Sequence, residues 1–192
     1  MTMALPLVLA SQSPRRKELL ETLGIPFSIL VSAADETPQV AELPEDYVVR
    51  VARTKGEDVA SRVTGSVVLS ADTVVTIDGE ILGKPTDRND AIRMLEKLSG
   101  REHEVYTAVC VIDQTTGKMR EGLDRTRVWF HRISRAQISD YIDRENVMDK
   151  AGAYAIQGFA SVYISKIEGS YSNVIGLPLA MVWELLPRPD LR

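Results

Sequence analysis

The stretch from Leu7 to Gly24 constrains the fold of this chain most strongly, because its pattern changes from strand to helix within a few residues. It begins with a short apolar run, Leu7–Ala10, and three polar residues follow. Pro14 suits the first position of a helix, where its missing N–H is not needed, and Ser13 is a favoured N-cap residue. Three leucines give the helix an apolar face before Gly24 ends it. We therefore predict a strand, a tight polar loop and a helix.

This loop has the features of an anion-binding site. The N-terminus of a helix offers unpaired N–H groups and the positive end of the helix dipole. Ser11, Ser13, Arg15 and Arg16 surround it, and guanidinium groups are suited to bidentate contacts with phosphate. The alternative is an ordinary capped helix with solvated arginines. The two serines, with a strand before them and a helix after, favour phosphate binding.

Composition limits the class of protein. The 192 residues suffice for one domain spanning 1–192 or for two closely packed lobes. The net charge of −4 predicts no bulk attraction to nucleic acid, so any phosphate affinity must be local. The single cysteine, Cys110, excludes an internal disulfide and a cysteine-based zinc cluster. No apolar run approaches ~20 residues, and the first residues make a poor signal peptide, so we expect no membrane span and a cytoplasmic location.

A lysine on the inward face of a predicted helix is the second unusual feature. The helix begins at Pro44 and runs to about Arg62, and its apolar stripe comprises Val48, Val51, Ala52 and Val59. Lys55 falls on the same stripe. A buried lysine needs a partner, and although its side chain could snorkel at a rim, we favour one that reaches an anionic site. The loop before this helix carries two adjacent carboxylates, Asp35 and Glu36.

An aspartate lies inside the most apolar run of the chain. Residues Ser66–Ile77 read as a buried strand, and Asp72 within it is costly to bury unless it is paired, hydrogen-bonded or bound to a metal. Asp78-Gly79 predicts a hairpin turn after this strand. Lys84 follows in a loop framed by glycine and proline, where it is either an ordinary turn lysine or a ligand-binding residue.

The rest of the chain continues the alternation of strands and helices. We expect helices at 87–99, from Ser134 to about 143, and after Pro178, and strands at 103–112, 118–123, 125–132 and 162–167. Small and polar residues at 149–158 predict a loop that makes poor core but allows close approach of a flat ligand. His103 and His131 have no metal-ligand spacing, and we interpret both as structural or solvated.

Together the polar exceptions indicate chemistry on phosphates. Arginine and lysine donors meet the charge that develops in phosphoryl or nucleotidyl transfer. Carboxylates without a His/Cys set suit Mg²⁺ or Mn²⁺ rather than zinc. The sequence contains neither GxxxxGK[ST] nor GxGxxG, which argues against a P-loop enzyme and a Rossmann dehydrogenase. The residues alone thus predict a metal-dependent α/β enzyme that handles phosphates.

The chain also resembles a known family across nearly its whole length. In order along the chain, it carries LASQSPRR, Asp35-Glu36, Lys55, SADTVV, GKP, SGR, DKAGAYAIQG and GSYSNVIGLP. This set resembles the Maf family of nucleoside triphosphate pyrophosphatases. The resemblance implies an α/β fold related to the inosine-triphosphate pyrophosphatases, with an elongated mixed sheet flanked by helices and two lobes around a cleft. It also implies a homodimer and a divalent-metal requirement.

The reaction implied by this resemblance is hydrolysis of a nucleoside triphosphate between the α and β phosphates, which yields a nucleoside monophosphate and pyrophosphate. Asp72 corresponds to the proposed general base, and Glu36 is the best metal or water-positioning candidate. The positions that match phosphate-binding residues of the family are Ser11, Arg16, Lys55 and Lys84. Four places depart from the usual family pattern: Gly56 stands where alanine is common, Ala108 and Ala155 where glycine is common, and Val147-Met148 where a proline-containing approach to Asp149 is common.

Three further positions separate subgroups of the family. Here they are Arg15, Thr73 and Gln157, a combination that resembles the subgroup acting on dTTP and UTP. The subgroup acting on 7-methylguanosine triphosphate typically carries Trp, Gln and Glu instead. The amide of Gln157 offers a hydrogen-bond donor and an acceptor to the edge of a pyrimidine base. A site built to hydrogen-bond one base rejects a different base, because its buried polar groups would then be left unpaired.

Several functions stay open at this point. The first is a dTTP/UTP pyrophosphatase that also removes modified pyrimidine nucleotides. The second is a 7-methylguanosine triphosphate pyrophosphatase, against which Thr73 and Gln157 argue. The third is a nucleotide-binding regulator of septum formation, although a pure binder has no need of Asp72 and Glu36. A phosphosugar nucleotidyltransferase is the weakest, because its usual glycine-rich N-terminal loop is absent.

Overall fold

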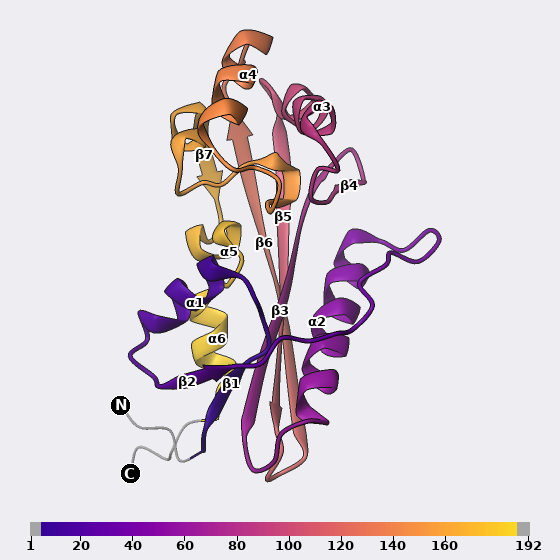
Figure 1. Cartoon of the computed structure of the whole chain (residues 1–192), viewed down its shortest axis with the longest axis vertical. Coiled ribbons are helices and arrows are strands. Elements are labelled where there is room, and N and C mark those ends of the chain that lie inside the picture. Colours follow the sequence, from indigo (N-terminus) through magenta and orange to yellow (C-terminus); the bar gives the residue numbers. More distant parts are fainter. Residues whose placement is uncertain (1–4, 188–192) are drawn as a thin grey trace. The chain divides into compact units, whose positions relative to one another are not determined.

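The computed structural model describes residues 5–187 and has the predicted α/β class (Figure 1). Its sheet is mixed, with the strand order β2-β1-β3-β5-β6-β7 and with β4 paired to β3. β1 runs parallel to both β2 and β3, whereas the β3–β4 and β6–β7 pairs are antiparallel. The strands are β1 (Leu7–Leu9), β2 (Phe27–Ile29), β3 (Val67–Ile77), β4 (Glu80–Leu82), β5 (Glu102–Asp113), β6 (Lys118–Phe130) and β7 (Ile164–Glu168).

Side-chain caps begin three of the described helices, and those at Ser13 and Ser134 were predicted. Ser13 caps α1 by accepting a hydrogen bond from the Arg16 amide, Asp87 caps α3, and Ser134 forms a complete capping box with Gln137. The α-helices are α1 (Pro14–Glu21), α2 (Pro44–Ala60), α3 (Arg88–Leu98), α4 (Arg135–Arg144), α5 (Tyr171–Ile175) and α6 (Leu179–Leu185), and two 3-10 helices are η1 (Ala151–Ala153) and η2 (Phe159–Tyr163). α5 and both 3-10 helices were not predicted from the sequence.

The chain forms two compact units, each assembled from separate segments. Of the described residues, the first unit comprises 5–72, 107–124 and 176–187, and the second comprises 73–106 and 125–175. That the two make a single domain stays a prediction. No helix in the described part of the chain is long and apolar enough to cross a membrane.

The core of the first unit follows from alternation along its strands. Leu7 and Leu9 of β1 pack with Leu20 of α1 and Val182 of α6, whereas Val8 packs on the other side with residues of α2. Figure 1 accordingly shows α1 and α6 on one side of these strands and α2 on the other. Successive side chains of a strand point to opposite faces of the sheet. A strand that is buried on both faces is therefore apolar throughout, as β1 is.

α2 lies unusually close to β3. Ser70 is fully buried and its Oγ donates to the carbonyl of Ala52 at 2.6 Å. A Cβ added at Gly56 would lie 2.8 Å from Ser70 Oγ, 3.2 Å from Ile112 Cδ1 and 3.4 Å from Cys110 Sγ. The glycine therefore permits this helix–sheet spacing, and Cys110 is the core residue that was predicted.

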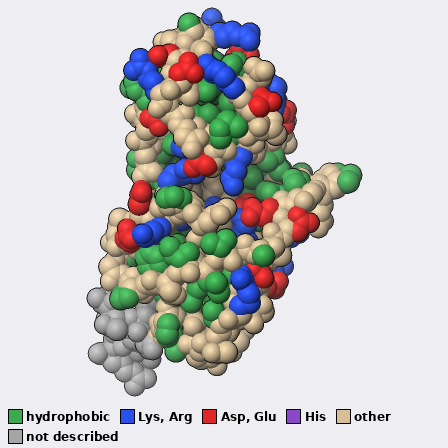
Figure 2. All heavy atoms as spheres, in the orientation of Figure 1, with side chains coloured by type: hydrophobic (Ala, Val, Ile, Leu, Met, Phe, Trp, Pro, Cys, Tyr) green, Lys and Arg blue, Asp and Glu red, His purple; other side chains and the backbone are tan. Residues whose placement is uncertain are grey.

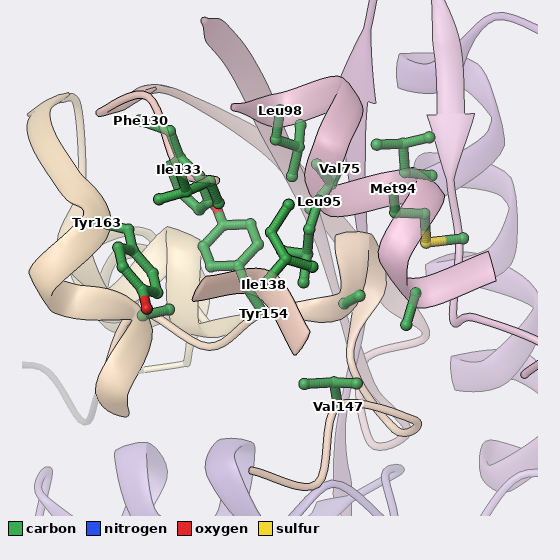
Figure 3. Close-up of a cluster of buried hydrophobic side chains, with 14 of the residues drawn as sticks. Val75, Met94, Leu95, Leu98, Phe130, Ile133, Ile138, Val147, Tyr154 and Tyr163 are labelled. Carbon is green, nitrogen blue, oxygen red and sulfur yellow. The ribbon is translucent and has the colours of Figure 1, made fainter. Parts of the chain in front are cut away.

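The second unit has its own core, which Figure 3 shows in close-up. Buried side chains from β3, α3, β5, β6 and α4 meet there, among them Val75, Leu95 and Phe130. Tyr154 also belongs to this core, and its ring lies beside Phe130. The prediction that 149–158 makes poor core is therefore wrong for part of the loop, because Ala153 and Tyr154 turn inward.

One predicted pair of strands is a single strand. Residues 118–123 and 125–132 were expected as two strands, but β6 runs unbroken from Lys118 to Phe130. Gly122 lies within this continuous strand. A Cβ there would lie 2.5 Å from the sulfur of Met181 in α6, so this glycine marks a close approach of a helix.

Candidate active site

A buried lysine–aspartate pair joins α2 to β3. Val68, Ser70 and Asp72 alternate onto the face of β3 that α2 covers, and the inward stripe of α2 includes Lys55. Lys55 Nζ lies 2.8 Å from Asp72 Oδ1, and both residues are buried, with 8% and 7% exposure. The prediction of an inward-facing lysine is confirmed. Its partner is Asp72, the aspartate that was expected to need a partner inside an apolar strand.

The same ammonium group contacts a second carboxylate. Glu36 Oε2 lies 2.8 Å from Lys55 Nζ, so the two carboxylate oxygens are at most twice that distance apart. The Glu36 side chain is about half exposed, whereas that of Asp72 is 9% exposed. The first unit thus holds one buried and one accessible carboxylate around a single cation.

Hydrogen bonds to the backbone fix the turn that carries Glu36. Tyr47, one helical turn before Val51 on α2, donates its hydroxyl to the Glu36 carbonyl at 2.8 Å. Asp35 Oδ1 accepts from both the amide and the hydroxyl of Thr37, and these bonds lower the pKa of Asp35. Arg50 donates to the Thr37 carbonyl at 3.1 Å. Asp35 therefore shapes the turn with this oxygen, and Glu36 is the residue that the turn directs toward Lys55.

The predicted anion loop precedes α1 and is organised by its serines. Ser11 Oγ accepts from the Ser13 amide at 3.2 Å and from the Arg16 guanidinium at 3.3 Å. Arg16 Nε donates to the carbonyl of Gly176 at 2.8 Å. Side chains and backbone from the two ends of the described chain thus hold Arg16 in place beside the N-terminus of α1.

Charges connect Arg16 to the carboxylates. Burial lowers the pKa of the Arg16 guanidinium, while Asp72 and Glu36 act to raise it and Arg15 acts to lower it. Arg16 therefore lies within electrostatic range of both carboxylates, and Arg15 lies near enough to affect it. Six of the nine predicted site residues gather in the first unit: Ser11, Arg15, Arg16, Glu36, Lys55 and Asp72.

The other three predicted site residues belong to the second unit. Thr73 follows Asp72 directly on β3. Lys84 is exposed in the loop after β4, as predicted, and Gln157 is exposed in a turn that the Gly158 amide closes by donating to the Ala155 carbonyl at 3.1 Å. Their approach to the six residues of the first unit stays a prediction from the sequence.

Comparison with known families gives the family of the chain. The family described as Maf-like protein matches residues 6–188 of the chain. The chain belongs to the Maf-like family.

Two relatives of high identity share one name. A protein of Geotalea uraniireducens (strain Rf4) named dTTP/UTP pyrophosphatase is 50% identical over 95% of this chain and 94% of its own length. A protein of Anaeromyxobacter dehalogenans (strain 2CP-1 / ATCC BAA-258) with the same name is 50% identical over 97% of this chain and 95% of its own. Among solved structures, the Staphylococcus aureus Ham1 protein matches with a TM-score of 0.47 and 13% identity, over 65% of this chain and 71% of that chain.

The donor set of this Maf-like protein bears on the expected divalent metal. Within residues 5–187, no group of three or more His, Cys, Asp or Glu side chains is placed to hold a metal ion. Mg²⁺ is commonly bound through one or two carboxylates together with substrate phosphates. Glu36 and Asp72 both contact the ammonium group of Lys55. Their carboxylates fit that pattern, with the phosphates of a substrate as the remaining ligands.

The surface of this Maf-like protein carries both signs of charge. Figure 2 shows basic and acidic side chains interspersed on the face in view. This distribution agrees with the net charge of −4 and gives no sign of a single basic face on that side.

Sequence reasoning missed two residues that position the site. Tyr47 holds the Glu36 carbonyl, and its signal was a polar hydroxyl on the inward stripe of α2. Gly176 holds Arg16 through a backbone carbonyl, for which the sequence gives no signal because any residue has this group.

Proposed function

We propose that this member of the Maf-like family hydrolyses dTTP and UTP between the α and β phosphates, releasing the nucleoside monophosphate and pyrophosphate. The observation that carries the proposal is the ammonium of Lys55 between the carboxylates of Glu36 and Asp72, close to Arg16 at the start of α1. Relatives of this chain at about 50% identity are named dTTP/UTP pyrophosphatase, which supports the choice of nucleotides.

The phosphates bind in this proposal at the N-terminus of α1. The positive end of the α1 dipole attracts the phosphates, the Arg16 guanidinium donates to phosphate oxygens, and Ser11 and Gly176 keep that guanidinium in place. Lys55 and Lys84 supply further positive charge along the phosphate chain. These cations meet the negative charge that moves onto the pyrophosphate as it leaves.

Asp72 acts as the general base in this proposal. Its carboxylate takes a proton from the water that attacks the α-phosphorus, a new P–O bond forms, and the bond to the bridging oxygen breaks. The low exposure of Asp72 keeps it directed at one position, and Lys55 holds it there. A divalent cation, Mg²⁺ or Mn²⁺, held by Glu36 would supply charge neutralisation on the phosphates and orient the water.

Arg15, Thr73 and Gln157 read the base in this proposal. Gln157 pairs its amide with the pyrimidine edge, since that amide can both donate and accept. We further propose a homodimer that works in the cytoplasm on free nucleotides and not on nucleic acid, in keeping with its net charge of −4.

The experiment that tests the function is release of pyrophosphate, with Mg²⁺ or Mn²⁺, from dTTP, UTP, CTP, the purine triphosphates and 7-methylguanosine triphosphate. Selective release from dTTP and UTP supports the proposal. Release from the methylated guanine nucleotide alone contradicts the assignment of Arg15, Thr73 and Gln157. Nucleotide binding without any release points instead to a regulator, such as one of septum formation.

The Asp72→Asn variant tests the chemical step. We expect hydrolysis to fall at least 10³-fold, on the order of a lost general base, while dTTP binding changes little. Near-normal turnover would exclude Asp72 as the base. Circular dichroism of the variant checks that the loss does not come from unfolding.

A further inference from the structure

A buried hydrogen bond anchors the turn that carries Gln157 to the core of the second unit. Tyr154, three residues before Gln157, is 6% exposed, and its hydroxyl lies 2.8 Å from Nε2 of His103. His103 belongs to β5 and is 1% exposed. The bond therefore joins the loop to a strand in the interior of the second unit.

Aromatic packing strengthens this anchor. The rings of His103, Phe130 and Tyr154 contact each other edge to face, with centroids 4.9 to 5.4 Å apart. Figure 3 shows Tyr154 in the middle of the surrounding core side chains. Such edge-to-face contacts favour one ring orientation, so Tyr154 has little freedom to move.

Further contacts hold the residues on either side of Gln157. The Ala155 amide donates to the Tyr141 hydroxyl at 3.4 Å, and the Phe159 amide donates to Glu145 Oε1 at 3.1 Å. Ile156 is buried, whereas Gln157 is exposed. A short, exposed turn is thus fixed at both ends by the core.

The same loop holds the segment of Lys84. The Gly152 amide donates to the Gly83 carbonyl at 3.0 Å. Gly152 has a φ of +67°, and a Cβ there would lie 3.0 Å from Val75, so only glycine fits this close approach. A displacement of the loop at Tyr154 would therefore affect the backbone next to Lys84 as well as the turn of Gln157.

We propose that His103 and Tyr154 are positioning residues that fix the Gln157 turn and thereby set the selectivity for the base of the nucleotide. This inference rests on the proposed function, in which Gln157 reads the base. A site discriminates by hydrogen bonds only if its groups stay in the productive position, since a displacement of about 1 Å weakens such contacts. Neither side chain contacts the nucleotide in this account.

The test compares two variants that remove one hydroxyl each from the same core. Tyr154→Phe removes the bond to His103 and keeps the ring. Tyr163→Phe is the matched control, because Tyr163 is buried in the same core and contacts Tyr141 and Phe159 edge to face. In Tyr154→Phe we expect the kcat/KM ratio of dTTP over GTP to fall about fivefold, the effect of one lost buried hydrogen bond, through a higher KM for dTTP. Tyr163→Phe leaves the ratio unchanged.

A double variant shows whether the effect passes through Gln157. If it does, Tyr154→Phe changes the ratio in the wild-type background and has no further effect in a Gln157→Ala background. An equal loss of selectivity in both backgrounds overturns the proposal. So does a loss in Tyr163→Phe as large as in Tyr154→Phe.

Conservative changes at His103 separate the hydrogen bond from packing. His103→Gln keeps a nitrogen at the position of Nε2, whereas the shorter side chain of His103→Asn does not reach it. We expect the glutamine variant to retain more selectivity than the asparagine variant. Equal loss in both contradicts a positioning role for the hydrogen bond.

Hydrogen exchange tests the anchor without any substrate. We expect the amides of Ala155, Gly158 and Phe159 to exchange at least about threefold faster in Tyr154→Phe than in Tyr163→Phe, because the loop that carries these donors would no longer be held against their acceptors. Unchanged exchange overturns the proposal. If the wild-type protein releases no pyrophosphate from any nucleotide, the proposed function fails, and this measurement still decides whether His103 and Tyr154 fix the turn.

Discussion

Gly56→Ala tests how closely α2 must approach the sheet. The change adds one methyl group to the buried side of α2, next to Lys55 in sequence. That methyl would lie 2.8 Å from Ser70 Oγ, where ordinary contacts begin at 3.4 Å. Either the Ser70 hydroxyl turns away from the Ala52 carbonyl, or α2 moves away from β3. Both outcomes disturb the strand face that carries Asp72, two residues after Ser70.

The expected free energies follow from two opposing effects. Overpacking a core costs about 1–3 kcal/mol, whereas alanine is favoured over glycine in a helix interior by about 1 kcal/mol. The variant should therefore be destabilised by about 1 kcal/mol. In a Ser70→Ala background the closest contact is gone, so the same change should be neutral or stabilising by up to about 1 kcal/mol. The coupling between the two positions should thus be about 1–2 kcal/mol.

Urea unfolding of the wild type, both single variants and the double variant measures this coupling, with pyrophosphate release as a parallel assay. We expect kcat to fall in Gly56→Ala, because the Lys55–Asp72 contact lengthens, and to recover in part in the double variant. Additive free energies would refute the reasoning, since they would mean that Ser70 does not limit the space at Gly56. Unchanged kcat in a destabilised Gly56→Ala variant would show that the helix–strand spacing does not set the geometry of the site.

Three further changes test other parts of the site. Gln157→Glu should reduce kcat/KM for dTTP and UTP by at least about tenfold, because a carboxylate has no donor for the base, while thermal unfolding stays unchanged; equal relative rates across bases would contradict this. Tyr47→Phe, which removes the bond to the Glu36 carbonyl, should reduce kcat/KM about fivefold and raise the Mg²⁺ concentration needed for half-maximal activity. Burial lowers the pKa of His103 to about 3, whereas its pKa in the unfolded chain is near 6.5. Between these two pH values the unfolded chain binds more protons than the folded protein, so the free energy of unfolding decreases as the pH is lowered. The free energy of unfolding should drop by about 2 kcal/mol from this residue between pH 8 and pH 5, and urea unfolding of His103→Gln should show a drop smaller by that amount.

Local signals in the sequence predicted most of the elements. Ser13 with Pro14 and Ser134 with Gln137 each cap a helix as predicted, because a cap depends on neighbours only two or three residues away. The inward Lys55 was also predictable, since a polar residue on an apolar stripe requires a partner. Lys55 has two partners, Asp72 and Glu36. This pairing depends on tertiary packing and cannot be predicted from the spacing of residues in the sequence.

Errors arose where a residue serves a distant contact. A break between the strands 118–123 and 125–132, and a loop outside the core at 149–158, were both expected from local propensity. The structure shows that Met181 lies over Gly122, and that Tyr154 is drawn inward by His103 on a strand about 50 residues earlier. Long-range packing overrides local preference at such positions, and a single sequence does not reveal it.

The bond from Arg16 to the Gly176 carbonyl has a consequence for how the protein is made. The first unit needs residues 176–187, whose α6 covers β1, and the second unit is complete at residue 175. During translation every residue of the second unit therefore emerges before α6 does. Since domains fold as their residues leave the ribosome, the core around Phe130 and Tyr154 can form while the first unit is unfinished. The guanidinium beside α1 is fixed only after Gly176 has been synthesised, so a nascent chain gains this arrangement after every residue of the second unit.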